Sequence, residues 1–232
     1  MAAKKNHESH ATDGKILEDV IWGGQDGLVN VLGLILGVAA ATSDSRIVII
    51  AGLAATFAES ISMAAVAYTS QKAGKQFLER ETQREMREIE ETPETEKLEI
   101  REIFEKKGFR GKDLDRAVEI ITSDKKVWLE TMISEELKLG SYDEKDPLRD
   151  GIIVGVSALV GSLVPLAPFF FLEMQSAFVF SIGLSILVLF GAGAVKAKKT
   201  IGDWRKSGLE MAAIGTLSAI AGYAVGILLK AP

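Results

Sequence analysis

Hydrophobic residues are concentrated in five long stretches, which are separated by short polar connections and by one long charged segment. Each stretch is apolar around its whole circumference and has roughly the 20 residues that a helix needs to cross a bilayer. Helices of a soluble domain would instead carry an apolar stripe on one side. The pattern therefore predicts an all-α membrane protein with five transmembrane helices, at about 20–42, 47–70, 151–172, 176–195 and 208–229.

The charged segment between the second and third stretches also has a helical pattern, without strand-like alternation. Its first part continues the second span, and Thr92-Pro93 marks a stop and a new helix start. Helices are expected at 71–91, 94–107, 112–123 and 125–139, and the chain as a whole is expected to comprise a flexible cytosolic tail (1–19), transmembrane helices 1–2 (20–70), a cytosolic helical metal-binding insert (71–148) and transmembrane helices 3–5 (149–232).

The polar connections indicate an orientation. The connection at 196–207 carries five Lys or Arg residues, whereas the connection after the third span carries none. Because positive charge prefers the cytoplasmic side, we expect the N-terminus and the insert in the cytosol and the C-terminus outside. Residues 1–19 lack the apolar core of a cleaved signal peptide, and the loops are short, so we expect a prokaryotic plasma membrane.

Three spans contain glycine pairs at a spacing of four, Gly33/Gly37, Gly151/Gly155 and Gly222/Gly226. This spacing lets helices approach closely in lipid, although for any one pair we favour ordinary glycine-rich packing of no special role. In the third span, Pro165 and Pro168 are expected to kink or break the helix, which membranes tolerate when neighbouring groups satisfy the backbone.

Composition narrows the chemistry. The chain is 47% hydrophobic and 25% charged, and about two-thirds of its 32 acidic residues lie in 71–150. It has no cysteine and only two histidines, His7 and His10, which excludes thiolate and His-rich metal sites. Any metal site must use carboxylates, carbonyls, amides or methionine sulfur. The basic residues form no unopposed stripe and the sequence pI is about 5.3, so no nucleic acid is expected as a partner.

Polar groups at membrane depth are the first candidate site. Asp26 lies in the first span and Glu59 and Met63 in the second, and an ionisable residue there costs several kcal/mol unless it faces a cavity or a partner. Glu59 and Met63 are one turn apart, and Asn30 is one turn from Asp26. Carboxylates, an amide and a thioether suit Fe²⁺ better than Mg²⁺ or Ca²⁺. The alternatives are that Asp26 is a helix-end residue near the interface and that Met63 is ordinary core packing.

Acidic residues of the insert form the second candidate site, because they recur at helical spacings of three and four. Carboxylates from facing helices can build di-metal sites in helical bundles. A solvated face of acids that pair with nearby bases is the alternative, and spacing alone does not decide between the two. The candidates are Glu81, Glu85, Glu88, Glu96, Glu99, Met132 and Glu136, whereas Glu90, Glu91, Glu94, Glu102 and Glu105 are assigned to the solvated background.

Several motifs together resemble the vacuolar iron transporter family, which includes yeast iron/manganese transporters. They are Gln25-Asp26-Gly27-Leu28-Val29 followed by GLILGVAAA, Ser60-Ile61-Ser62-Met63-Ala64-Ala65, the glutamate helices, the PETE turn at 93–96, and GSLVPLAPFF in the third span. The resemblance covers nearly the whole chain from residue 18.

The resemblance implies a five-span homodimer with the translocation path at the dimer interface. It implies export of cytosolic Fe²⁺, and of Mn²⁺, in exchange for protons, with Zn²⁺ and Co²⁺ as further ions at the same sites. By position, Asp26 and Met63 take pathway roles, and the roles of cytosolic metal ligands fall to Glu85, Glu88, Glu96, Glu99, Met132 and Glu136.

This chain departs from the family pattern at two positions. Ala55 stands where some members carry a pathway glutamate, and we expect Glu59, one turn later, to substitute for it. Ile133 stands where a second methionine is found, which leaves a slightly harder site.

A transporter, and no enzyme, is thus the expected function. Two alternatives remain: a membrane-anchored ferroxidase or iron-storage module, and a membrane scaffold that binds no metal. The Glu-x-x-His motif of di-iron bundles is missing, which argues against the first. The second predicts no metal in the insert.

Overall fold

The structure is a computed structural model that describes residues 8–138 and 146–229, with side chains from Gly14 onward. The chain divides into two compact units. The membrane unit comprises the residues up to Thr69 and those from Pro147, and the charged unit comprises Ser70–Asp146.

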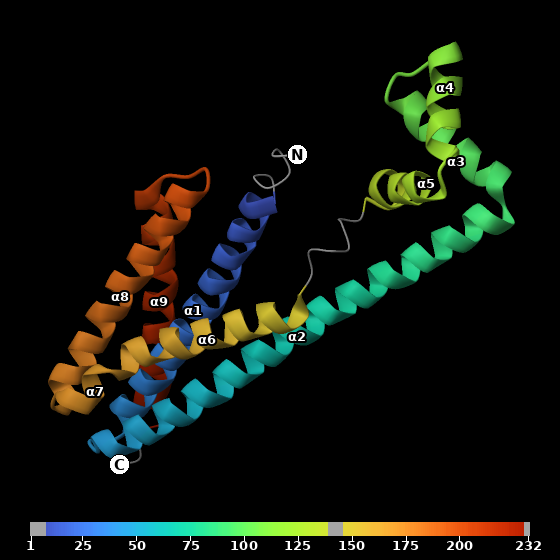
Figure 1. The fold of residues 1–232 in the computed structure, drawn as a ribbon. Coiled ribbons are helices and arrows are strands. Elements are labelled where there is room, and N and C mark those ends of the chain that lie inside the picture. The colour runs from blue at the N-terminus through green and yellow to red at the C-terminus, as the bar shows by residue number, and fades with distance from the viewer. Residues whose placement is uncertain (1–7, 139–145, 230–232) are drawn as a thin grey trace. The chain divides into compact units, whose positions relative to one another are not determined.

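Every regular element in the described part of the chain is a helix, as the sequence predicts, and five helices are long and apolar enough to cross a membrane. The membrane unit (Figure 1) contains α1 (Glu8–Ala41), the first part of α2 (Ser45–Glu91), α6 (Pro147–Leu166), the short α7 (Pro168–Phe171), α8 (Met174–Lys199) and α9 (Trp204–Leu228).

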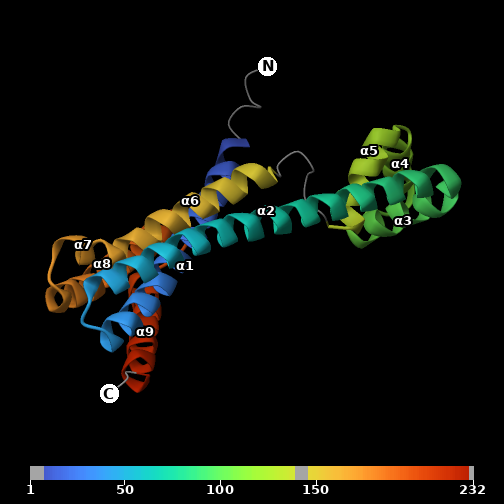
Figure 2. The ribbon, with the colours of Figure 1, turned by 90° about the horizontal axis from the view of Figure 1, so that it is seen from below.

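Helix α1 is the central element of the membrane unit, and it packs against α6 on one side and α9 on another. Figures 1 and 2 both show α1 among α6, α8 and α9. Small residues permit this contact. A Cβ added at Gly27 would lie 2.3 Å from the carbonyl oxygen of Ala158, and one added at Gly222 would lie 1.8 Å from that of Gly33. The glycine pairs of the sequence thus mark helix–helix contacts.

Gly222→Val should therefore destabilise the membrane unit. The new side chain would meet the backbone of α1, which cannot move aside as a flexible side chain can, and overpacking of this kind costs about 1–3 kcal/mol or more. Gly183→Val is the matched control, because nothing lies within 4 Å of a Cβ added to that glycine in α8. Thermal unfolding of the purified chain in detergent measures both; equal loss of stability in the two variants would contradict the packing of α1 on α9.

The third span breaks at its prolines, as the sequence predicts. Pro165 lies inside α6, and the chain begins the separate helix α7 at Pro168. The hydroxyl of Ser181 in α8 donates a 2.7 Å hydrogen bond to the carbonyl oxygen of Pro165. A neighbouring helix thus satisfies a backbone group next to the break, which lipid could not do.

One sequence-based prediction is wrong for part of the N-terminus. Residues 1–19 were expected to be a flexible tail, but α1 begins at Glu8, so the polar residues 8–19 extend the first transmembrane helix. These residues are polar but include no proline that would break a helix, so the helix extends N-terminally beyond the apolar span. Residues 1–7, including His7, lie outside the described part of the chain.

The charged unit is a small helical bundle with its own apolar core. It contains the remainder of α2, α3 (Pro93–Lys106), α4 (Gly111–Thr122), α5 (Lys125–Thr131) and the π-helical turn η1 (Met132–Glu136). Gly108 has φ +101°, a conformation that favours glycine, and it follows the end of α3 as the sequence predicts. The core residues are Ile89, Ile100, Leu114, Val118, Trp128 and Met132.

Candidate metal sites

The first candidate site is a hydrogen-bonded group between α1 and α2 in the membrane unit. The amide nitrogen of Asn30 donates to Glu59 Oε1 at 3.0 Å and to Asp26 Oδ2 at 3.3 Å. The two carboxyl groups, one on each helix, thus share a single amide donor. Two acids on consecutive spans thus face one another rather than lipid.

Asp26 is not a helix-end residue, because α1 begins at Glu8 and continues to Ala41. The candidate span begins at Gly14, which places Asp26 about 18 Å along the helix axis at 1.5 Å per residue. Met63 lies one turn beyond Glu59 on α2 and is half-buried, outside the hydrogen-bonded group. Ala55 packs against the apolar core of the unit.

The second candidate site lies in the charged unit, where three helical elements bring glutamates together. Ligand oxygens of Glu85, Glu88 and Glu96 lie within 4.8 Å of one another, and so do those of Glu96, Glu99 and Glu136. Glu96 is common to both sets. Helices α2 and α3 contribute two residues each, and η1 contributes the fifth. These five glutamates, separated by up to 51 positions in the sequence, form one continuous carboxylate cluster.

Two carboxylate oxygens of this cluster have no partner. Glu85 is 1% exposed and Glu96 is 4% exposed, and the Oε2 atom of each is buried without a hydrogen bond. A buried carboxylate oxygen without a donor is costly. Arg84 offsets part of the charge, since it pairs with Glu85 at 3.2 Å and with Glu88 at 3.6 Å. A divalent cation would satisfy the remaining oxygens, so the cluster fits a hard or borderline metal ion.

The electrostatics of the cluster favour protonation when no cation is bound. Burial, followed by the charges of Glu99 and Glu85, raises the pKa of Glu96 to about 7. Partial burial of its carboxyl group, with the charges of Glu85 and Glu99, raises the pKa of Glu136 to about 7. Protons and metal ions therefore compete for these carboxylates near neutral pH.

Two sequence candidates in the charged unit occupy different surroundings. Glu81 is buried and forms a 2.7 Å ion pair with Arg84, outside both carboxylate sets. Met132 is fully buried in the apolar core beside Trp128. It is the first residue of η1, and the N–H of Leu137, which follows η1, donates to the Met132 carbonyl oxygen at 3.2 Å. This π-helical turn carries Glu136, and such turns are frequent at functional sites.

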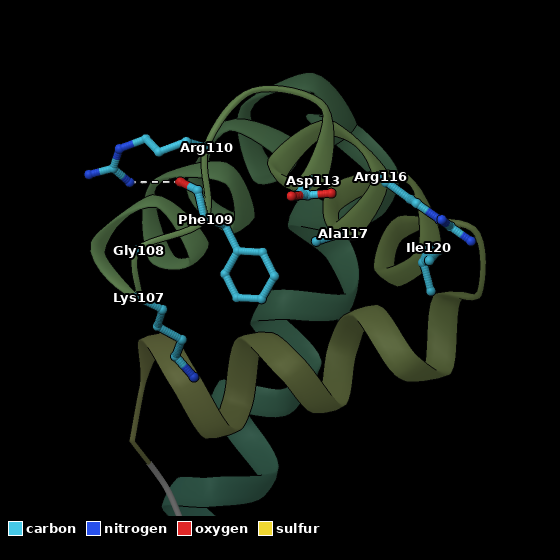
Figure 3. Close-up of a pocket in the computed structure, with 8 residues that line it drawn as sticks. All are labelled: Lys107, Gly108, Phe109, Arg110, Asp113, Arg116, Ala117 and Ile120. Carbon is cyan, nitrogen blue, oxygen red and sulfur yellow. Dashed lines mark hydrogen bonds between the residues drawn. The ribbon is translucent and has the colours of Figure 1, made fainter.

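A separate pocket of about 590 Å³ lies on the charged unit where α3 gives way to α4 (Figure 3). The ring of Phe109 points into it, while the Arg110 side chain points away and donates to the Phe109 carbonyl oxygen at 2.7 Å. None of the sequence-predicted metal ligands lines this pocket.

Sequence reasoning missed a second set of buried acids in the membrane unit. Asp19 is 5% exposed and Asp150 is 4% exposed, and Lys15 forms an ion pair with Asp150. The spacing of Asp19 from Asp26 was an available signal, because residues seven apart lie on the same face of a helix. Asp150 could not be paired with Asp19 from the sequence, since 131 positions separate them.

Fold and sites together define the class: a helical membrane protein with acids facing one another between two spans and a carboxylate cluster on a charged helical unit. Comparison with known proteins agrees with this class. The sequence model described as the VIT family matches residues 17–227. The chain is 33% identical to "Vacuolar iron transporter 1" of rice, over 96% of this chain and 90% of that protein. It is 35% identical to "Vacuolar iron transporter" of Toxoplasma gondii, over 98% and 78%.

The chain therefore belongs to the VIT family, as the resemblance in its motifs predicted. Its relatives are named as transporters, so it is grouped with membrane transport proteins and not with enzymes.

The comparisons correct the expected location. Short loops and the absence of a signal peptide led to the expectation of a prokaryotic plasma membrane, and this expectation is wrong. The matching proteins are vacuolar transporters of eukaryotes, among them rice, Eucalyptus grandis and Toxoplasma gondii. Loop length follows from the packing of the helices and does not report which membrane holds them.

Proposed function

We propose that the chain is a transporter that moves Fe²⁺, with Mn²⁺ as a second ion, out of the cytosol in exchange for protons. The names of its relatives support iron as the transported metal. The observation that carries the proposal is the group in which Asn30 bridges Asp26 and Glu59. Acids are retained at membrane depth when a cation or proton must pass them.

Glu59 takes the place of the family carboxylate that Ala55 lacks. It lies one helical turn along α2 and receives the stronger of the two Asn30 hydrogen bonds, at 3.0 Å. Protons and an arriving divalent cation would compete for the two carboxylates that Asn30 bridges, and this competition is the basis for proton exchange. Met63, one turn further, would add a soft sulfur ligand that favours Fe²⁺ over Mg²⁺.

We further propose that the transporter is a homodimer with the ion path between two copies. Asn30 is exposed on the single chain, although it lies in a transmembrane helix. A groove between α1 and α9, lined by Asn30 and by small residues such as Gly33 and Gly37, adjoins it. A polar group that bridges two acids is unfavourable next to lipid, and a second copy would cover it while closing the path around the acids.

The charged unit is proposed to face the cytosol and to collect metal ions for transport. Its unpartnered Glu85 and Glu96 oxygens would take the place of part of the hydration shell of the ion. Arg84 would leave or share its carboxylates when the ion binds, which keeps affinity moderate and permits release. Zn²⁺ and Co²⁺ would bind the same oxygens.

Acid should weaken metal binding to the charged unit. With the pKa values of Glu96 and Glu136 raised to about 7, protons occupy both carboxylates below that pH. We expect the apparent affinity for Mn²⁺ to fall at least about tenfold from pH 7.5 to pH 5.5, since each displaced proton contributes up to tenfold per pH unit. Calorimetric titration of the full chain at both pH values measures this; equal affinity would contradict metal binding by these carboxylates.

The metal-free charged unit should become more stable as the pH is lowered. A protein whose acids form salt bridges becomes less stable under the same change. A carboxyl group whose pKa is raised on folding binds more protons in the folded chain than in the unfolded chain between about pH 4.5 and 7. The free energy of unfolding should therefore increase as the pH is lowered through this window and decrease as the pH is raised through it.

The experiment that tests the proposed function is metal flux into liposomes that contain the purified chain. A pH-sensitive dye and a metal-sensitive dye inside the vesicles would report proton and Fe²⁺ movement together. The proposal expects Fe²⁺ and Mn²⁺ flux that depends on a pH gradient. Flux without proton movement would remove the exchange step, and absence of flux with intact metal binding would favour an iron-storage module.

A further inference from the structure

A buried ionic cluster between the N-terminal half of α1 and the first turn of α6 is separate from both candidate sites. Asp19 of α1 and Asp150 of α6 are each at least nine-tenths buried. Lys15 forms an ion pair with Asp150, and its side chain is 32% exposed. The Oδ2 atom of Asp19 is buried and has no hydrogen-bond partner.

The cluster carries more negative than positive charge. Asp19 experiences the charges of Asp150 and Glu18, which are negative, and of Lys15 and Arg149, which are positive. Three acids against two bases leave one negative charge uncompensated. Burial of an uncompensated carboxylate is costly unless a cation binds it.

The position of Asp19 connects this cluster to Asp26. The two residues are seven apart on α1, so they lie on the same face of the helix and about 10 Å apart along its axis. Lys15 lies one turn before Asp19 on α1, and it forms its ion pair with Asp150 of α6. One face of α1 thus presents an ammonium group, a buried unpartnered carboxylate and the Asp26 group in succession.

From these contacts we propose that Asp19 and Asp150 form a further divalent-cation site, and that the Lys15 ammonium occupies it as a tethered cation. A metal ion would bind both carboxylates once the partly exposed Lys15 side chain moves out toward solvent. The lysine lowers the affinity of this site, so that ions do not remain bound on the face that leads to Asp26. Its role in transport rests on the proposed function, whereas binding of the ion does not.

Mn²⁺ alone is the probe, and the loss of the free-ion electron paramagnetic resonance signal measures binding to the full chain in detergent. The background variant carries Asp26→Asn, Glu85→Gln and Glu96→Gln, so that the two other sites are weakened. In this background, Lys15→Met should raise Mn²⁺ affinity by about tenfold or more, because a competing cation is removed. Lys15→Arg should give no gain, and adding Asp19→Asn to Lys15→Met should abolish the gain.

An unchanged affinity in Lys15→Met, or a gain that survives Asp19→Asn, would overturn the proposal and leave Lys15 as a structural ion pair between α1 and α6. Size-exclusion chromatography and circular dichroism report whether each variant folds. Should Lys15→Met not fold, the background and its Asp19→Asn derivative decide the matter. Loss of weak Mn²⁺ binding on Asp19→Asn supports the site, and unchanged binding refutes it.

Because the binding test uses a background in which Asp26 is already replaced, its outcome is independent of the transport assay. Absence of flux in the unaltered chain would count against the proposed function while leaving a Lys15-sensitive Mn²⁺ site in place. Normal flux without such a site would retain the transporter and remove only the tethered-cation role.

Discussion

Asp26→Ala is expected to reduce Fe²⁺ flux into liposomes about 100-fold or more. The substitution removes one of the two carboxylates that Asn30 bridges, and loss of even an outer partner of a metal ligand costs about 10–100-fold in affinity or activity. It also removes one of the two carboxylates for which protons would compete with the metal ion. Metal flux and proton flux should therefore fall together in the same vesicles.

The matched control for this prediction is Asp44→Asn. Asp44 lies in the connection between α1 and α2 and accepts a 2.8 Å hydrogen bond from the Arg46 N–H, which asparagine can also accept. This variant should transport at the rate of the unaltered chain. If Asp26→Ala folds and retains more than about a tenth of the flux, Asp26 is not in the ion path.

Replacing both Glu85 and Glu96 by glutamine is expected to weaken metal binding to the charged unit by about 10–100-fold. These residues carry the two buried oxygens that lack a partner, and glutamine offers a neutral amide instead of a carboxylate. Tryptophan fluorescence can follow the binding in a chain with Trp22→Phe and Trp204→Phe. Trp128, in the core of the charged unit, is then the only tryptophan.

The same pair of substitutions should stabilise the metal-free chain at pH 8. Ionised Glu96 is unfavourable in the folded unit, as its pKa of about 7 indicates, and a neutral side chain avoids that cost. We expect a gain of about 1–3 kcal/mol in the free energy of unfolding of this unit. A lower metal affinity together with a higher free energy of unfolding would show that these carboxylates bind metal although they destabilise the folded unit.

Glu102→Gln is the control for the carboxylate cluster, because Glu102 is 70% exposed and only pairs with Lys106 at 3.7 Å. It should alter neither metal affinity nor stability by a measurable amount, since exposed ion pairs contribute little. Equal metal affinity in Glu102→Gln and in the double variant would support the scaffold interpretation of the charged unit and would remove it from the transport mechanism.

The two principal predictions separate collection of the ion from its passage. Changes in the charged unit should raise the KM for Fe²⁺ and leave the maximal flux largely intact. Changes at Asp26 should lower the maximal flux at every Fe²⁺ concentration. If both changes alter the same kinetic parameter, the two metal sites act in the same rate-limiting step.

The positions of the helices and several of their ends could be predicted from the sequence, because they depend on interactions between neighbouring residues. Five stretches apolar on every side can only be stable in lipid as helices, and the structure has these five helices. Pro168 and Gly108 ended helices where expected, because the first cannot continue the preceding helix and the second adopts φ +101°. The polar residues 8–19 were misread, since polarity indicates exposure to water and does not exclude a helix.

Tertiary structure alone decided which polar residues meet. Spacing placed Glu81, Glu85 and Glu88 on one helical stripe, but it could not determine that only Glu85 and Glu88 lie close to Glu96 of α3. It likewise gave no means to bring Asp150 to Lys15, 135 positions earlier in the sequence, or to Asp19. Helical periodicity is a property of neighbours along the chain, whereas a site is made by packing between helices.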